Sequence, residues 1–297
     1  MFIIKYRKIF FTISGLLVIA SIAAISILGF DLSIDFTGGA ILEIEYTNDR
    51  PETVEIKDTL DKLQITNAVV QPIGTNSFIL RTRDLSPVEK TALDQALSLD
   101  NKYSFEEVRF SSIGPVIGEE LARKGLLAIG LVILLIIIFI AFAFRGATKE
   151  VSSWKYGVVA IITLAHDIII PVGLIAILGH YTIAEVDALF LTALLAILGL
   201  SINDTIVIFD RIRENLKHKV SPHFEDIVGI SLNQTITRSI NTSLTTIIVL
   251  LALLFLGGQT TKYFALTLAI GMALGTYSSI FLAAPLLVTW EKIGKKS

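Results

Sequence analysis

Six long apolar runs constrain this chain more than any other feature of its sequence. They occupy residues 9–30, 125–144, 156–178, 188–209, 239–256 and 264–290. About 20 apolar residues in a helix cross a bilayer, whereas the apolar part of a cleaved secretory signal has only roughly 7–15. Apolar residues make up 53% of the chain, above the roughly 45–50% of soluble domains. We therefore predict a membrane bundle of six transmembrane α-helices.

Basic residues predict the orientation of these helices, because lysine and arginine are enriched in cytoplasmic loops. Here they fall near both termini and in alternate loops: Lys5, Arg7, Lys8, Arg145, Lys149, Lys155, Arg211, Arg213, Lys217, Lys219, Lys292, Lys295 and Lys296. The opposite short loops carry Glu185 and Asp187, or Lys262 alone. We therefore expect both termini in the cytoplasm and residues 31–124 on the far side of the membrane.

The stretch between the first and second spans has the pattern of a folded domain. Its apolar residues alternate as in strands at 41–46, 68–73, 77–82 and 103–110, and follow helical spacing at 51–63 and 86–98. Strand periodicity and helical periodicity are distinct signals. The order β-α-β-β-α-β predicts a small α+β domain of the ferredoxin-like type, with both helices on one face of an antiparallel sheet.

These patterns divide the chain into three predicted parts. Residues 1–30 form the cytoplasmic N-terminus and first span, 31–124 the exterior α+β domain, and 125–297 the remaining five spans. The last part includes a cytoplasmic loop at about 211–237. The later half of that loop suits an amphipathic helix lying on the membrane surface.

Composition and missing motifs exclude several classes of protein. The net charge is −2, so no basic field would attract nucleic acid. The sequence has no cysteine, which removes disulfides and thiolate chemistry. It also lacks the HExxH, P-loop and GxSxG motifs that carry zinc protease, nucleotide hydrolase and serine hydrolase chemistry. We therefore expect no metal, no organic cofactor and no enzymatic activity of its own.

The informative residues are polar groups inside the spans, since an ionisable side chain at bilayer depth is costly and usually functional. They are His166 and Asp167 in the third span, Asn203, Asp204 and Asp210 in the fourth, and Arg238 at the start of the fifth. Asn203 and Asp210, seven residues apart, share a helix face, while Asp204 is rotated from Asn203 by about 100°. We expect Asp210 and Arg238, at matching depth, to form an ion pair that proton uptake breaks.

Each of these residues also has a structural interpretation. Asp210 could be an interfacial residue tied to Arg211 and Arg213, and Asp204 could be satisfied by a serine or threonine hydroxyl. His166 and Asp167 could form a polar clamp between helices. They are not expected to hold a metal, because neighbouring residues of a helix point apart.

Two glycine-rich turns flank the exterior domain. Asp35, Gly38 and Gly39 follow the first span, and Gly114, Pro115 and Gly118 precede the second. Glycine permits sharp turns, so these segments are interpreted as turns that together could let the exterior domain swing.

Five strings occur in an order that resembles a known family. They are SIDFTGG at 33–39, GPVIGEEL at 114–121, AHD at 165–167, SINDTIVIFDRIREN at 201–215 and TRSINTS at 237–243. Together they resemble the SecD/SecF family of the bacterial preprotein translocase, which is related to the RND superfamily. The resemblance covers nearly the whole chain, and the string ending in DRIREN is the most specific.

The resemblance implies an inner-membrane subunit that works with SecD and the SecYEG channel, with YajC and YidC, on a translocating preprotein. The coupling ion would be the proton, with Asp210 and Arg238 in the responsive site and Asp204 as a secondary candidate. A six-span half from SecD would complete the proton path. Two alternatives remain: half of an RND-type exporter of lipids or small molecules, and a scaffold that only holds SecD. The single small exterior domain favours the translocase, because such exporters usually carry larger insertions.

Overall fold

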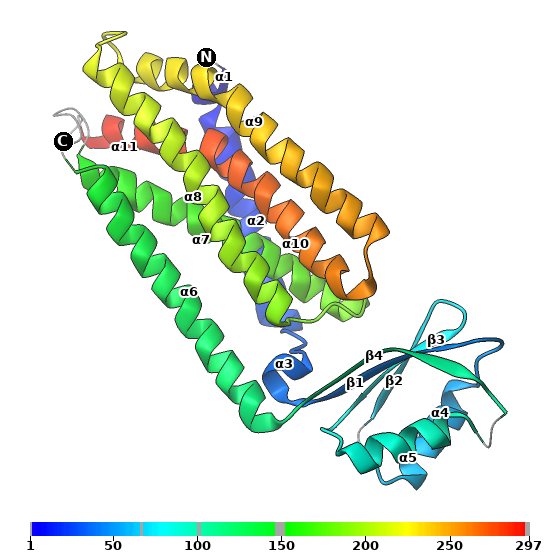
Figure 1. The fold of residues 1–297 in the computed structure, drawn as a ribbon. Coiled ribbons are helices and arrows are strands. Elements are labelled where there is room, and N and C mark those ends of the chain that lie inside the picture. The colour runs from blue at the N-terminus through cyan, green and yellow to red at the C-terminus, as the bar shows by residue number, and fades with distance from the viewer. Residues whose placement is uncertain (1, 66–67, 100–101, 146–151, 295–297) are drawn as a thin grey trace. The chain divides into compact units, whose positions relative to one another are not determined.

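The computed structural model describes residues 2–65, 68–99, 102–145 and 152–294 (Figure 1). The chain divides into two compact units, a membrane unit of Met1–Asp31 with Leu127–Ser297 and an exterior unit of Leu32–Leu126. Six described helices are long and apolar enough to cross a membrane, at Arg7–Leu28, Pro115–Ala143, Trp154–Tyr181, Ala188–Lys217, Phe224–Leu256 and Thr260–Lys292. The prediction of a six-helix membrane bundle is confirmed.

The helices of the membrane unit differ in how deeply they are buried. In order they are α1 (Phe2–Lys5), α2 (Arg7–Leu28), α6 (Pro115–Ala143), α7 (Ser153–Tyr181), α8 (Ala188–Lys217), α9 (Phe224–Leu256), α10 (Gln259–Tyr277), the π-helix η1 (Ser278–Ala283) and α11 (Ala284–Gly294). About half or more of α7, of α8 and of the sixth span is buried, whereas α2, α6 and α9 expose most of their apolar surface. The sixth span therefore packs at the centre, against α7, α8 and α9 (Figure 1).

Small residues allow this central packing. A Cβ atom on Gly275 of α10 would lie 2.9 Å from the Cβ of Ser201 on α8, and one on Gly271 would lie 2.2 Å from Ile197 Cδ1. Without interhelical hydrophobic attraction in lipid, close backbone approach is a main source of helix association. The sixth span and α8 are consequently in backbone-close contact at Gly275 and Ser201.

The exterior unit is a four-stranded sheet with two helices on one face (Figure 1). Its elements are α3 (Ile34–Thr37), β1 (Gly39–Tyr46), α4 (Thr53–Lys62), β2 (Val69–Ile73), β3 (Ser77–Thr82), α5 (Pro87–Leu97) and β4 (Phe105–Ile113). The strand order is β2-β3-β1-β4, and every neighbouring pair is antiparallel. The predicted ferredoxin-like arrangement is confirmed.

Alternation along β1 and β3 supplies the core of this unit. Leu42 and Ile44 of β1 and Phe78 and Leu80 of β3 are buried on the helix-covered face, because successive strand residues point to opposite sides. The inward residues of α4 and α5 complete the cluster: Ile56, Leu60, Leu93 and Leu97.

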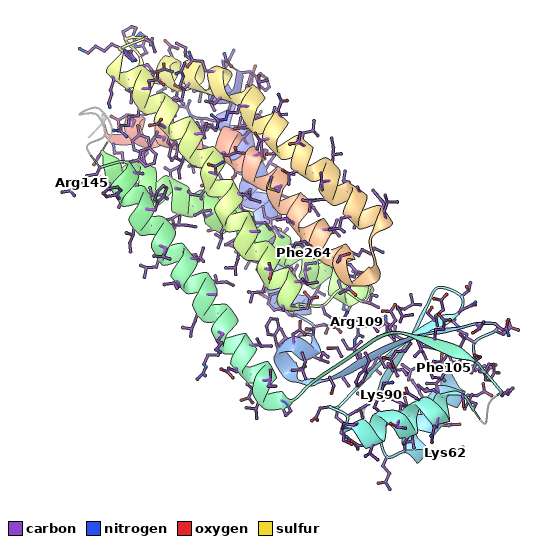
Figure 2. The ribbon with its side chains drawn as sticks, in the orientation of Figure 1. Lys62, Lys90, Phe105, Arg109, Arg145 and Phe264 are labelled. Atoms are coloured by element: carbon purple, nitrogen blue, oxygen red, sulfur yellow. The ribbon has the colours of Figure 1, made fainter. Side chains whose placement is uncertain are left out.

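Local signals position α5 on the sheet. Ser86 caps the helix by accepting from the Glu89 backbone N–H, and Pro87 occupies the first turn, where its missing N–H costs nothing. Lys90, labelled in Figure 2, pairs with Asp94 on the same helix and with Glu107 of β4 at 2.6 Å. The helix is thereby tied to the edge of the sheet.

The cytoplasmic loop predicted at about 211–237 is wrong. Helix α8 continues to Lys217 and α9 begins at Phe224, so only 218–223 connect them. Ile212 and Val228 are fully buried within one apolar cluster, and Asn215 Nδ2 donates to Ser231 Oγ at 2.8 Å. The apolar residues assigned to a membrane-surface helix instead pack between the extended ends of α8 and α9.

The two glycine turns meet in one close-packed joint within the exterior unit. A Cβ on Gly38 would lie 2.6 Å from Pro115 Cα, one on Gly118 would lie 2.7 Å from Gly38 N, and one on Gly39 would lie 2.7 Å from Thr82 O. Gly38 has a φ of +74° and Gly39 a φ of +133°, conformations that favour glycine. The turns are confirmed, and the swing of the exterior domain stays a prediction.

The remaining residues of the two turns are less crowded. Asp35 lies in the four-residue helix α3, where its backbone N–H donates to Ser33 Oγ at 3.2 Å. A Cβ on Gly114 would meet nothing within 4 Å. The close approach therefore involves the α3–β1 turn and the first turn of α6, and not the whole of either segment.

Candidate functional site

A short polar segment of the sixth span contacts two carboxylates inside the membrane unit, buried Asp167 and half-buried Asp204. We name residues 276–279, at the junction of α10 and η1, the 276–279 strip. Thr276 Oγ1 donates to Asp204 Oδ2 at 3.3 Å, and Ser278 Oγ donates to Asp167 Oδ2 at 2.7 Å. Within the strip, between Tyr277 and Ser278, the α-helix changes to a π-helix, a feature that is frequent at functional sites.

Asp167 is the most deeply buried of the predicted site residues. Its exposure is 0%, and its carboxylate accepts hydrogen bonds from Ser201 of α8 at 2.5 Å and from Ser278 of η1 at 2.7 Å. His166 Nδ1 lies 2.8 Å from its other oxygen. The interpretation as a helix–helix clamp agrees with this geometry. The expectation that His166 and Asp167 point apart is wrong, because their side chains turn toward each other.

His166 links this carboxylate to the aromatic packing of the sixth span. Its ring is 3% exposed and stacks on Tyr277, with centroids 6.1 Å apart. Tyr277 in turn reaches α2, where its hydroxyl group donates to Phe10 O at 3.3 Å and accepts from Ser14 Oγ at 3.3 Å. Among the residues that the structure describes, His166 Nε2 is buried without a hydrogen-bond partner.

Asp204 lies half-buried on the opposite side of the strip, facing α9. Besides Thr276, the hydroxyl groups of Ser239 and Ser243 face its carboxylate, and Arg238 is close enough to act on its charge. The predicted hydroxyl partner of Asp204 is therefore confirmed. The arginine predicted to pair with Asp210 is instead close enough to act electrostatically on Asp204, without a recorded ion pair between them in the described chain.

Asp210 does not form the predicted pair with Arg238. Its side chain is 71% exposed, and its carboxylate partner within the described chain is Arg213, with Nη1 4.0 Å from Oδ1. The same turn of α8 buries Phe209 and Ile212, so Asp210 lies on the outward face. The alternative interpretation, an interfacial residue near the arginines of its own helix, agrees with the structure.

The outer face of α8 and α9 carries polar groups at the depth of the apolar spans. Asn203, Arg238, Asn241 and Thr242 are exposed there beside half-buried Asp204. We name these five residues the polar face. Hydrocarbon is an expensive environment for such groups, so protein or water must cover them. Across the described ranges, no three His, Asp or Glu side chains gather as metal ligands.

Sequence reasoning missed the 276–279 strip and did not pair Asp167 with Ser201 or Ser278. Serine and threonine in a span commonly bond the carbonyl four residues earlier, so their presence alone gives no signal. Only the partner across the helix interface distinguishes Ser201 and Ser278 from the other hydroxyl residues of the spans.

The fold and this site define a multi-pass membrane protein that holds two carboxylates among hydroxyl groups inside its helical bundle. Two family models match the chain: "Protein export membrane protein SecD/SecF, C-terminal" over residues 94–293, and "SecD/SecF GG Motif" over residues 23–49. The chain belongs to the SecD/SecF family.

Curated relatives and solved structures agree with this assignment. The Protein translocase subunit SecF of Thermobaculum terrenum is 42% identical, over 97% of this chain and 93% of the relative. That of Anaerolinea thermophila is 40% identical, over 97% and 94%. The crystal structure of SecDF, a translocon-associated membrane protein from Thermus thermophilus, matches with a TM-score of 0.83 at 33% identity. The match covers 97% of this chain but only 38% of the SecDF chain.

Proposed function

We propose that this chain acts as the SecF-type subunit of a bacterial preprotein translocase and uses proton movement to promote export across the inner membrane, with both termini cytoplasmic. Its likeness to subunits named SecF over nearly their whole length supports the translocase role. The observation that carries the proton role is half-buried Asp204, which is held by Thr276 and faces Arg238 at the polar face. It works without enzymatic chemistry or a cofactor.

Asp204 is the proton-responsive carboxylate in this proposal, and Asp210 is not. A carboxylate between a hydroxyl donor and an arginine has partners for its charged form, while half-burial favours its neutral form. Asp210 is largely exposed, and its charged neighbour Arg213 lies 4.0 Å away on the same helix, so protonation of Asp210 would change little in helix packing. Asn203 and Arg238 are exposed beside Asp204 on the polar face.

SecD is the proposed partner at the polar face. A second six-span half packed there would remove the exposed polar groups from lipid and place the proton path between the halves. The assembly would include the SecYEG channel, with YajC and YidC, and the exterior unit would act on the emerging preprotein. The covering of a polar surface at bilayer depth is the physical argument for this arrangement.

The test replaces Asp204 by asparagine in cells whose only copy of the gene is the variant. We expect preprotein export to lose its dependence on the proton gradient, because asparagine preserves the size and the Thr276 hydrogen bond but takes up no proton. Asp210→Asn is the matched control and should export normally. Immunoblotting would show equal amounts of both variants.

Normal export by Asp204→Asn at normal protein level would reject the proton role and favour a scaffold that only holds SecD. Co-purification from membranes tests the class separately. Recovery of SecD and SecYEG is expected, whereas recovery of a periplasmic adaptor would indicate an exporter of lipids or small molecules.

A further inference from the structure

Asp167 and Asp204 both contact the same short segment of the sixth span. Asp167 and Asp204 lie on different helices, α7 and α8, yet each accepts a hydrogen bond from a hydroxyl group of the 276–279 strip. Thr276 and Ser278, two residues apart in a helix, point about 200° apart. The strip therefore lies between the carboxylates and bonds one on each side.

The packing beside the strip does not allow its two ends to move independently. Gly275, the residue before the strip, is in backbone-close contact with Ser201 of α8, and Ser201 itself donates to Asp167. Asp204 is one turn further along the same helix. Packed interfaces of this kind switch between discrete arrangements and do not deform continuously. A shift of the strip at Thr276 must therefore be accompanied by a shift at Ser278.

The π-helix supplies a place where such a shift can occur. η1 starts at Ser278, and the i→i+5 pattern of a π-helix adds one residue to a turn. Returning that turn to α-helical bonding would move Ser278 relative to Asp167. Thr205 Oγ1 and Ser279 Oγ form a further contact of the strip at 2.8 Å, and this contact involves neither carboxylate.

A charged Asp167 would need a positively charged partner, because the hydroxyl groups of its serine partners carry no charge. A fully buried carboxylate with no positive partner is strongly unfavourable, and His166 is the group in contact that can carry a proton. Among the described residues, the other titratable group in contact with the pair is Tyr277 of α10, which stacks on His166, while Asp204 lies on the far side of the strip. Residues 9–28 of α2 contribute no charged side chain.

We propose that His166 and Asp167 form a second proton-holding pair, coupled to Asp204 through the 276–279 strip, with Asp167 as a positioning residue. The inference rests on the proposed role of Asp204. When the Asp204 carboxylate takes up a proton, Thr276 loses a charged acceptor, and hydrogen bonds to charged groups are roughly twice as strong as neutral ones. The strip relaxes, Ser278 changes its bond to Asp167, and the proton shared by Asp167 and His166 is redistributed. Coupling is reciprocal.

The experiment measures both sites in the full chain in lipid nanodiscs, so it does not depend on transport. Infrared difference spectra follow the protonated carboxyl band of Asp204, assigned by its loss in Asp204→Asn. Nitrogen-15 spectra of histidine-labelled protein follow His166, assigned among the four histidines by its loss in His166→Gln. In the unmodified chain, the His166 signals should change over the same pH interval as the Asp204 band.

Three variants decide the proposal. Asp204→Asn should abolish the change of His166 in that interval, and Ser278→Ala should reduce it at least twofold. Thr205→Val removes a buried hydroxyl pair of the same strip but touches no carboxylate, so it should leave the change intact. Equal melting temperatures of Ser278→Ala and Thr205→Val would show that both fold alike.

Several results would overturn the coupling. One is a His166 signal that does not change with pH. Another is a pH-dependent change of that signal that is unaltered in Asp204→Asn or Ser278→Ala. The third is a change that Thr205→Val reduces as much as Ser278→Ala does. Failure of the proposed function has a different signature, since normal export by Asp204→Asn would reject the proton role whatever the spectra show.

Discussion

Replacing Gly118 by alanine tests the close packing of the joint in the exterior unit. The added Cβ would lie 2.7 Å from Gly38 N and 3.1 Å from the carbonyl carbon and oxygen of Phe36. All three are backbone atoms, which cannot rotate away as a flexible side chain can, so the α3–β1 turn and the start of α6 must separate. Overpacking of this kind costs about 1–3 kcal/mol. Gly118 does not have a positive φ, so backbone strain adds nothing.

Three further glycines separate overpacking from backbone strain. Gly114→Ala meets nothing within 4 Å and should be nearly neutral. Gly74→Ala also has open space but a φ of +53°, so it should cost about 1–2 kcal/mol by conformation alone. Gly38→Ala combines a φ of +74° with a Cβ 2.6 Å from Pro115 Cα and should be the most harmful of the four.

Amide hydrogen exchange in the full chain measures these losses of stability within the exterior unit. The backbone amides of Leu42 in β1 and Leu80 in β3 report opening of the sheet. Since about 1.4 kcal/mol is a tenfold change, Gly118→Ala should exchange about 5–150 times faster than the unmodified chain. Equal exchange in Gly118→Ala and Gly114→Ala would refute the close-packed joint.

Two further predictions concern the exterior unit. Phe78→Ala should destabilise the unit by about 3–5 kcal/mol, because it leaves a cavity in a fully buried site. Val69→Ala, on the exposed edge, should change the free energy of unfolding by no more than about 0.5 kcal/mol. Denaturant unfolding measures both changes. Hydrogen bonds from Arg83, and then from Ser86, lower the pKa of Glu89 to about 2 from 4.5. The stabilisation by the Glu89 carboxylate is therefore present above pH 4.5 and lost as the pH falls toward 2. Between these pH values, the melting temperature of Glu89→Gln should fall less than that of the unmodified chain. An equal fall in both proteins would contradict this prediction.

The fold was predictable because its signals are local. The strand β3 was predicted at 77–82, where it occurs, since alternating apolar residues between turn residues identify a strand. Ser86 and Pro87 likewise predict the start of α5. The connection between α8 and α9 was predicted too long, because the charges of 211–219 resemble a loop when their burial against another helix is unknown.

The site was predictable only in part, because helix rotation and register are not local properties. Polar residues within apolar spans identified His166, Asp167 and Asp204 as functional candidates. The choice of Asp210 as the partner of Arg238 assumed that matching depth implies contact. Depth fixes position along the axis, whereas contact also needs the correct face, and that face of α8 carries Asp204.

The register of the sheet has a mechanical consequence. Gly39, the first residue of β1, pairs with Ile113, the last residue of β4, so both tethers of the exterior unit leave from adjacent ends of two bonded strands. A pulling force on the unit would load the tethers together and would not peel one strand from the other. The exterior unit would therefore transmit a force to the rest of the chain through two hydrogen-bonded strands at once.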